Sequence, residues 1–556
     1  MPFVSSARSL FLLAAASGIL LYASFFPVNL GFLGWIALVL MLHLVHSTVR
    51  PRVVYLAAFT GGMVFYVPAL QWMRVAHPAM YGTWAFLALM SSAYMAFSIF
   101  LVRLLDRRGM PLYLSAPAVF VGLDYFRASF PTGFTWLEPL GIQHRIGFNW
   151  YFLGYTQHDN SLVLQMASLG GVYLVSFLVV MVNATLYLWF RRLQTGVGRR
   201  PWPAVGVTAS LLIAGLLIGR GDQGSSNEPA GPRVALLQSN LPQAVKMAES
   251  QAVDQQMGNL LRQAIDVPAD QFPDLVVWPE TTCSGDWSEA SADVNPSLLN
   301  DEWRARLMFS SRLSKGIGAW KANQLLGLNA MIMESDGRQW KYNSAKLINK
   351  DGTPGPRYDK MHLVPFGEYV PLESVFPWMS AFTPYTHDYS CKPGENFTRF
   401  PLKVNGVDYT FGCIICYESS DSSLARRYAV RDEEGGPVDF IVNISNDGWF
   451  NGTEEHEQHL AICRFRAVEC RRSIVRAVNM GISCIIGPDG EILQLPGETW
   501  ADSVKVTAVV NGVVPIHKGE SLYPKLGDWV PLVCLLIVVI GLLSPLVFRC
   551  CRTEPS

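Results

Sequence analysis

The residues with the clearest chemical potential lie at the end of a short apolar segment, Phe411–Ser419. The segment reads Phe-Gly-Cys-Ile-Ile-Cys-Tyr-Glu-Ser, so an apolar run gives way to a cysteine, a tyrosine and a glutamate. Apolar runs of this length are typical of buried strands, and catalytic groups often stand where a strand passes into a loop. We therefore predict that Cys416 is a nucleophile, although a lone strand cysteine is more often buried and inert.

Cys413 and Cys416 also have the C-x-x-C spacing of a redox pair or of half a zinc site. Residues three apart on a strand point to opposite faces, so one of the two should be core and the other should belong to the site. All ten cysteines follow residue 280 at irregular spacing, which does not indicate a disulfide framework. We predict neither a metal site nor a cofactor.

Two further segments end apolar runs with ionisable side chains. Asp274–Glu280 reads Asp-Leu-Val-Val-Trp-Pro-Glu, and its proline stops the strand and leaves Glu280 at the edge of the sheet. Arg357–Glu368 contains Lys360 and ends in Glu368. Alone, these would be ordinary loop and surface groups. Beside a cysteine, a carboxylate can take the thiol proton, and a lysine can stabilise the thiolate and a tetrahedral oxyanion.

The elements that must position these groups are apolar runs between residues 232 and 525. Several runs are continuous rather than alternating, which is typical of strands covered on both faces in layered α/β folds. The predicted strands include residues 234–237, 275–278, 324–328, 411–416 and 440–444. Helical patterns lie between them, so a layered α/β domain is expected here.

A helix is predicted over residues 454–478, because apolar residues recur there at steps of three and four. The stripe consists of Leu460, Cys463, Ala467, Cys470 and Ile474. After it, the residues Gly-Pro-Asp-Gly at 487–490 predict a turn between two late strands.

The apolar residues of the chain are concentrated before Arg220. Half of the 556 residues are hydrophobic and only 16% are charged, below the roughly 25% of an average soluble protein. The formal net charge is zero, so no global field attracts nucleic acid. A bilayer core needs about 20 apolar residues per helix. The predicted spans, about eight, are residues 8–26, 31–48, 53–72, 84–104, 111–126, 162–190, 203–219 and 528–548.

These spans predict four parts: a transmembrane domain over 1–220, a linker over 221–231, a soluble domain over 232–525, and a last span with a short tail over 526–556. If successive spans cross the membrane in alternating directions, arginines such as Arg50, Arg107 and Arg191 lie at span ends on the same side. Because arginine-rich loops stay in the cytoplasm, both termini should be cytoplasmic and the soluble domain should lie outside the cytoplasm.

The order and contexts of Glu280, Lys360 and Cys416 resemble the nitrilase, or carbon–nitrogen hydrolase, superfamily. With the apolar N-terminal half, the Lys-x-His-Leu-Val-Pro-Phe-Gly-Glu motif at 360–368 and Ile-Ser-Asn-Asp-Gly-Trp-Phe at 444–450, nearly the whole chain resembles the bacterial apolipoprotein N-acyltransferase family. The resemblance implies an α-helical transmembrane bundle joined to an α/β domain of nitrilase type, an α-β-β-α sandwich with a Glu-Lys-Cys triad.

The resemblance also implies a two-step reaction at the bacterial inner membrane, with the catalytic domain in the periplasm. Cys416 would take the acyl chain of a phospholipid as a thioester, and the α-amino group of a diacylglyceryl-cysteine on an apolipoprotein would then accept it. This is the last step of lipoprotein maturation. Glu280 would be general base and then acid, and Lys360 would stabilise the oxyanion.

Three supporting residues follow from the same resemblance. Glu368 would orient the lysine or the incoming amine, and Tyr417 and Glu418 match the positions that flank the nucleophile. Simple packing is the alternative for all three. One departure stands out at Met247, where family members often carry tryptophan after the lysine of Leu-Pro-Gln-Ala-Val-Lys.

Two other functions compete with acyl transfer. A membrane-tethered amidase that hydrolyses a C–N bond would use the same triad, but it would have no need for about eight spans. A transporter or scaffold with an inactive domain is disfavoured by the scarcity of charge within the spans.

An apolar loop after Glu368 contains Trp378 and Phe382, and we predict that it is a mobile lid that admits acyl chains. Trp136, in the aromatic-rich segment 127–161, is a further candidate lipid contact.

Replacing Trp378 and Phe382 together with serine should abolish most acyl transfer, because the loop would lose its affinity for lipid chains. The measurement is transfer from labelled phospholipid, with the melting temperature as a control for folding. Undiminished transfer by a folded variant would contradict the lid.

Overall fold

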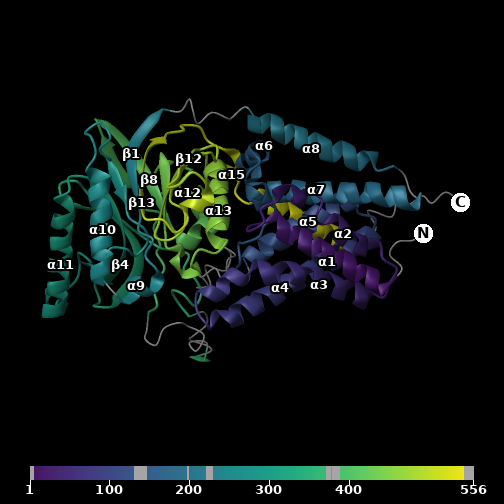
Figure 1. The fold of residues 1–556 in the computed structure, drawn as a ribbon, viewed down its shortest axis with the longest axis horizontal. Helices are drawn as coiled ribbons and strands as arrows, with labels where there is room; N and C mark the ends of the chain where they lie inside the picture. Colours follow the sequence, from purple (N-terminus) through teal and green to yellow (C-terminus); the bar gives the residue numbers. More distant parts are fainter. Residues whose placement is uncertain are drawn as a thin grey trace. The chain divides into compact units, whose positions relative to one another are not determined.

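The computed structural model describes residues 6–129, 147–196, 200–220, 229–248, 250–370, 377–378 and 389–543. The chain divides into two compact units, one of residues 1–223 with 525–556 and one of residues 224–524 (Figure 1). The predicted linker, 221–231, lies largely outside the described residues, and the first strand of the second unit begins at Ala230.

The first unit is helical. Its longer helices are α1 (Ala7–Ser24), α3 (Pro51–Ala69), α4 (Met80–Arg107), α5 (Leu112–Ser129), α7 (Ala167–Thr195), α8 (Trp202–Arg220) and α16 (Trp529–Leu543). Among the described residues, α1, α3, α4 and α7 are the 4 helices long and apolar enough to cross a membrane. Shorter apolar helices lie within 31–46, 202–218 and 529–543. The total of about eight spans stays a prediction.

The predicted span at 31–48 is not one continuous helix. It consists of η1 (Gly31–Trp35), α2 (Val39–Leu42) and η2 (His43–His46). Side chains of other helices satisfy the interrupted backbone: Asn183 accepts from the Leu38 N–H at 2.8 Å and donates to the Gly34 carbonyl at 2.9 Å. Unpaired backbone groups are costly in an apolar surrounding, so these contacts make the interruption tolerable.

The aromatic residues of 147–158 that the structure describes are buried within the first unit. Trp72 donates from Nε1 to the Tyr151 hydroxyl at 3.0 Å, and the Tyr151 ring packs edge-on against Phe25 and Phe65. These rings fill the interior between η5 (Leu153–Gln157), α6 (Ser161–Leu164) and their neighbouring helices.

The described strands of the second unit form two sheets. The first has the order β13 (Ala508–Pro515), β1 (Ala230–Gln238), β2 (Leu275–Val277), β4 (Asn323–Met333), β5 (Gln339–Ile348) and β6 (Pro354–Asp359), with β3 (Trp287–Ala290) paired to β4. The second has the order β12 (Ile492–Gln494), β11 (Cys484–Ile486), β10 (Ser473–Val478), β9 (Phe440–Ser445), β8 (Val407–Ile415) and β7 (Phe400–Val404). Strands β1, β2 and β4 are parallel, as are β8, β9 and β10.

The two sheets pack face to face, because one buried cluster contains residues of both, such as Val277 and Leu325 with Cys413 and Val442. Helices α10 (Ser250–Ile265) and α11 (Asp301–Gly318) cover the outer face of the first sheet. Helices α12 (Ser422–Arg427) and α13 (Glu455–Cys470) cover that of the second. The unit is therefore an α-β-β-α sandwich, as predicted, and its continuous apolar runs are explained by burial on both faces. Short helices α9 (Gln243–Ala248), α14 (Trp500–Ser503) and α15 (Leu522–Leu526) complete it.

Three local predictions are confirmed. Each predicted apolar run contains or forms part of a strand. Cys413 is fully buried in the core between the sheets, whereas Cys416 is half-buried. The residues at 487–490 form the turn between β11 and β12, where the Gly487 N–H donates to the Glu491 carbonyl at 2.8 Å.

The predicted helix over 454–478 is wrong in its last third, residues 471–478. The helix α13 ends at Cys470, Arg471 takes a left-handed φ of 48°, and the chain continues as β10. Ile474 fitted the helical stripe only by spacing. It lies on β10, and its side chain packs with the stripe of α13 in the same buried cluster. The sequence Ser-Ile-Val-Arg-Ala-Val suits a strand that is buried on both faces.

Candidate active site

Cys416 stands at the point where β8 ends and the short helix η9 (Cys416–Ser420) begins. Its φ of 52° lies in the left-handed region, which is strained for a residue with a Cβ. This conformation breaks the alternation of side chains along the strand. Cys416 is therefore half-buried and packs against the same buried cluster that contains Cys413, instead of pointing to the opposite face of the sheet.

Glu418 holds this turn in place. Its carboxylate accepts hydrogen bonds from the backbone N–H groups of Ile415 at 2.6 Å, Met361 at 2.7 Å and His362 at 3.0 Å. Burial raises the pKa of the Glu418 carboxyl, while these three N–H groups favour its ionised form. The side chain thus joins the turn at Cys416 to the loop after Lys360. These contacts agree with a packing role for Glu418, which was the alternative to a role in the reaction.

Lys360 follows β6 and lies between two carboxylates. Its Nζ is 3.1 Å from Glu280 Oε1 and 2.9 Å from Glu368 Oε2. Asn343, on β5, donates from Nδ2 to an oxygen of each carboxylate at 2.7 Å. Burial disfavours the ammonium, but Glu280, Glu368 and Cys416 outweigh it and raise the pKa of Lys360 well above its usual range. Lys360 is therefore a permanent cation.

Glu280 follows β2 and is buried. The next residue, Thr281, has a left-handed φ of 49°. Lys246, on α9, holds this second strained turn by donating to the Glu280 carbonyl at 2.8 Å and to the Thr281 hydroxyl at 2.7 Å. Burial lowers the pKa of Lys246 to about 8, although the charges of Glu280 and Cys416 oppose that shift.

The structure brings the predicted triad together. Burial raises the pKa of the Cys416 thiol well above its usual range, the Glu280 carboxylate adds to the rise, and the Lys360 ammonium opposes it. The thiol form of Cys416 is therefore favoured, so the predicted nucleophile would need a base that removes its proton. Glu280 and Lys360, which act on the sulfur through their charges, are 3.1 Å apart.

The other predicted residues have different surroundings. Glu368 lies in the site, where its second oxygen also accepts from the Val364 N–H at 2.8 Å. The Tyr417 ring packs edge-on against His362 at 5.2 Å between centroids. Trp378 is 62% exposed. Trp136 and Phe382 lie outside the described residues.

Asn343 and Lys246 were not singled out from the sequence as site residues. Asn343 is a polar residue on a strand that is otherwise largely apolar at its buried end, which is a weak signal. Strands β1 and β2 are parallel, so they end at the same edge of the sheet. Lys246 follows β1 and Glu280 follows β2, and this shared edge is the signal that could have identified Lys246.

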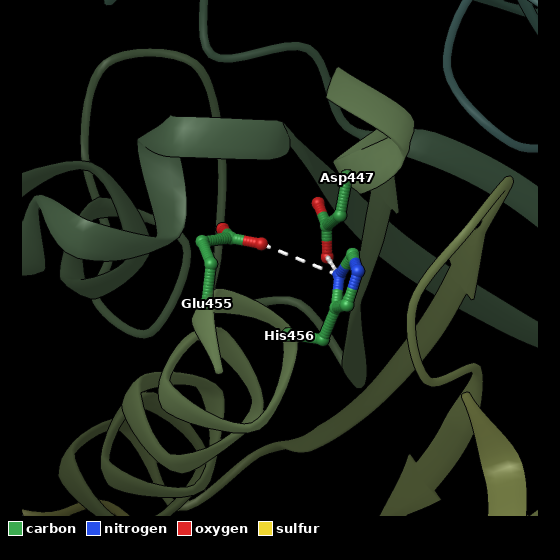
Figure 2. A group of neighbouring side chains, drawn as sticks. All are labelled: Asp447, Glu455 and His456. Atoms are coloured by element: carbon green, nitrogen blue, oxygen red, sulfur yellow. Dashed lines mark ion pairs between the residues drawn. The ribbon is translucent and has the colours of Figure 1, made fainter. Parts of the chain in front are cut away.

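A second buried group of ionisable side chains consists of Asp447, Glu455 and His456 (Figure 2). Their ligand-type atoms lie within 4.8 Å of one another, a spacing that a metal ion could use. However, Arg476 already donates to Asp447 Oδ2 at 2.6 Å. His456 Nδ1 lies 3.3 Å from Glu455 Oε2 and 3.9 Å from Asp447 Oδ2. The two carboxylates are balanced by Arg476 and a proton on His456, so the group suits a closed ion network better than a cation site.

The second unit belongs to a recognisable class of enzymes. Residues 233–514, about half of the chain, match the carbon-nitrogen hydrolase family. Among solved structures, an amidase from Nesterenkonia sp. AN1 is similar at 17% identity and a TM-score of 0.35, covering 52% of this chain and 92% of that one.

Residues 17–185 match the apolipoprotein N-acyltransferase N-terminal domain. The apolipoprotein N-acyltransferase of Geobacter metallireducens is 31% identical over 93% of this chain and 92% of its own length. That of Rhodopirellula baltica is 27% identical over 93% of both chains. The chain belongs to the apolipoprotein N-acyltransferase family, which confirms the resemblance drawn from its motifs.

Replacing Asn343 with leucine should lower acyl transfer about 10- to 100-fold, because hydrogen bonds to charged groups contribute roughly 1.5–3 kcal/mol. The variant removes the amide between the two carboxylates and leaves Lys360 in place. Transfer from labelled phospholipid measures the effect, with the exposed Asn259→Leu on α10 as a control. A rate equal to that of the control would show that Asn343 does not organise the site.

The stability of the second unit should fall at alkaline pH. Burial opposes the charged form of His456, but Asp447 and Glu455 outweigh it and raise its pKa from 6.5 to about 9. A raised pKa stabilises the fold fully below about pH 6.5, and this contribution is lost as the pH rises through about 9. The loss should be on the order of 3 kcal/mol.

Thermal melting at a series of pH values measures this dependence. His456→Gln should flatten it between about pH 7 and 9, whereas His517→Gln, elsewhere in the unit, should retain it. A His456→Gln profile parallel to that of the wild type would contradict the assignment.

Proposed function

We propose that this chain transfers an acyl chain from a membrane phospholipid to the N-terminal α-amino group of apolipoproteins, through a thioester on Cys416. The observation that carries the proposal is a half-buried cysteine, within the fields of a carboxylate and a fixed ammonium, in a member of the apolipoprotein N-acyltransferase family. Such a site can activate a sulfur and stabilise an oxyanion without a metal or cofactor.

In the first half-reaction, Glu280 removes the thiol proton and the sulfur attacks the ester carbonyl of the phospholipid. The ammonium of Lys360 stabilises the tetrahedral oxyanion. The intermediate then expels the glycerol oxygen of the lysophospholipid, which takes the proton from Glu280. A buried ammonium suits this role, because its ion pairs with Glu280 and Glu368 fix its position before charge develops on the substrate.

In the second half-reaction, the neutral α-amino group of the diacylglyceryl-cysteine attacks the thioester. Glu280 takes a proton from the attacking nitrogen, the C–S bond breaks, and Glu280 passes that proton to the leaving sulfur. The amide product leaves the enzyme in its starting state. We assign Glu368 and Asn343 to positioning the lysine, and Tyr417 and Glu418 to positioning the nucleophile turn.

The proposed setting is the bacterial inner membrane. We assign residues 1–220 and 526–556 to the membrane, 232–525 to a periplasmic catalytic domain, and both termini to the cytoplasm. The 4 long apolar helices of the described residues and the placement of the arginines support this topology.

We further propose that the loop around Trp378 contacts lipid. An exposed tryptophan is costly in water and favourable at a membrane interface. Phe382 and Trp136 are proposed lipid contacts on their sequence alone.

A membrane-tethered amidase is the alternative for the same triad. The relatives that match more than nine-tenths of the chain are N-acyltransferases, and the apolar N-terminal unit would have no role in hydrolysing a soluble amide. Both facts favour acyl transfer.

Wild-type protein incubated with phospholipid carrying a labelled acyl chain, without an acceptor, should hold a label that hydroxylamine releases. Cys416→Ala should hold none, because the variant lacks the sulfur that forms the thioester. Glu280→Gln and Lys360→Met should slow labelling by about 100-fold or more. The control is Cys391→Ser, which removes another half-buried thiol of the same unit.

Labelling of Cys416→Ala to the wild-type level would remove the thioester from the mechanism. An unlabelled wild type that releases ammonia from small amides would instead establish the amidase.

A further inference from the structure

The loop that follows β1 joins the two sheets of the second unit beside the proposed base, and the reaction proposed for this chain gives it no role. The loop comprises residues 239–242 and leads into α9, which carries Lys246. By its place in the chain it belongs to the first sheet. Its side-chain and backbone hydrogen bonds, however, go to Asn479, which directly follows β10 of the second sheet.

The Asn479 side chain is fully buried and holds this loop from both of its polar atoms. Its Oδ1 accepts from the Ser239 hydroxyl at 2.6 Å and from the Leu241 N–H at 2.9 Å. Its Nδ2 donates to the Leu241 carbonyl at 2.9 Å and to Asn446 Oδ1 at 2.8 Å. An amide offers two donors and two acceptor sites, and all of them are used here. A buried polar group that is fully satisfied in this way rigidifies its surroundings.

A second contact extends the same hold to α9 itself. Asn446 directly follows β9, and its Nδ2 donates to the Oε1 of Gln243, the first residue of α9, at 2.9 Å. The helix has only 6 residues. Isolated helices shorter than about 12 residues are marginal in water, so the place of α9 depends on contacts such as these.

Lys246, on α9, carries this hold to the base. Its Nζ donates to the Glu280 carbonyl at 2.8 Å and to the Thr281 hydroxyl at 2.7 Å. Thr281 has a left-handed φ, a conformation that persists only where the surroundings fix it. The Glu280 carboxylate projects from this turn and lies 3.1 Å from Lys360 Nζ. The place of the carboxylate therefore depends on the place of Lys246.

We propose that Lys246 and Asn479 are positioning residues for Glu280. Asn479 fixes the loop after β1, the loop sets the place of α9, and Lys246 holds the turn from which Glu280 acts. The second sheet, which carries the proposed nucleophile, thereby sets the place of a base that is carried by the first sheet. This inference rests on the proposed role of Glu280 as the base.

The test is a single turnover of thioester formation by the full-length protein in detergent, with phospholipid carrying a labelled acyl chain in excess. In Lys246→Met, the rate constant should fall about 100-fold, because a small misplacement of a reacting group can cost that much. The phospholipid concentration that gives the half-maximal rate should stay unchanged. The final amount of label per folded protein should also equal that of the wild type, since the nucleophile is intact.

A double-mutant cycle tests the link between the two residues. Asn479→Ala should lower the rate constant about 10-fold. The double variant should be no slower than Lys246→Met alone, because both residues act through one contact. If Asn479→Ala fails to fold, Gln243→Leu, which breaks the contact with Asn446, takes its place in the cycle.

The matched controls are Lys315→Met on α11 and Asn259→Ala on α10, which remove the same groups at exposed positions and should keep the wild-type rate constant. The melting temperature of each variant reports its folding. A purely structural role would lower the final amount of label and leave the rate constant unchanged.

A wild-type rate constant in folded Lys246→Met would overturn the proposal. Effects that multiply in the double variant would overturn the link from Asn479. If the wild type forms no thioester, the proposed function fails by itself. The same variants are then compared by ammonia release from a small amide, which would use the same base, and an unchanged rate in Lys246→Met would again overturn the proposal.

Discussion

The buried ammonium of Lys360 between Glu280 and Glu368 is the interaction on which the site depends. Two unit charges 4 Å apart interact by about 4 kcal/mol at an effective dielectric constant of 20, and these pairs are closer. Desolvation of three charges opposes that gain, so the geometry must be good and the remaining oxygens must find donors. Asn343 and the Val364 N–H supply them. The arrangement therefore requires the ends of β2 and β6 and the middle of β5 to meet at fixed distances.

The same site contains two strained turns, at Thr281 and at Cys416. A residue with a Cβ in the left-handed region costs of order 1–3 kcal/mol and persists only where its surroundings fix it. Lys246 fixes the first turn through the Glu280 carbonyl, and Glu418 fixes the second through the Ile415 N–H. A charged side chain thus fixes the backbone beside each of the two predicted catalytic residues. The two turns lie where β2 and β8 end, next to the predicted base and the predicted nucleophile.

Polar groups in the two units are satisfied by different means. In the second unit, buried carboxylates meet cations and backbone N–H groups, as Glu418 and Asp447 do. In the apolar unit, the broken segment at 31–46 relies on neutral side chains such as Asn183 and on the buried Arg103, which donates to the Leu44 and Ser47 carbonyls. Both solutions follow from one rule, that a buried polar group without a partner is too costly to keep.

The sequence by itself determined the layered class, the strand runs and the burial of Cys413, because the burial of a strand is encoded in neighbouring residues. Strand alternation predicted the opposite face for Cys416, but the left-handed turn there places it against the same cluster as Cys413. The sequence also failed locally at 471–478, where the spacing of Ile474 suited a helix but the left-handed turn at Arg471 began a strand. Only the tertiary structure decided that Asn343 and Lys246 adjoin the predicted triad. These residues are far apart along the chain, and the strand order of the two sheets, which no local pattern specifies, brings them to one place.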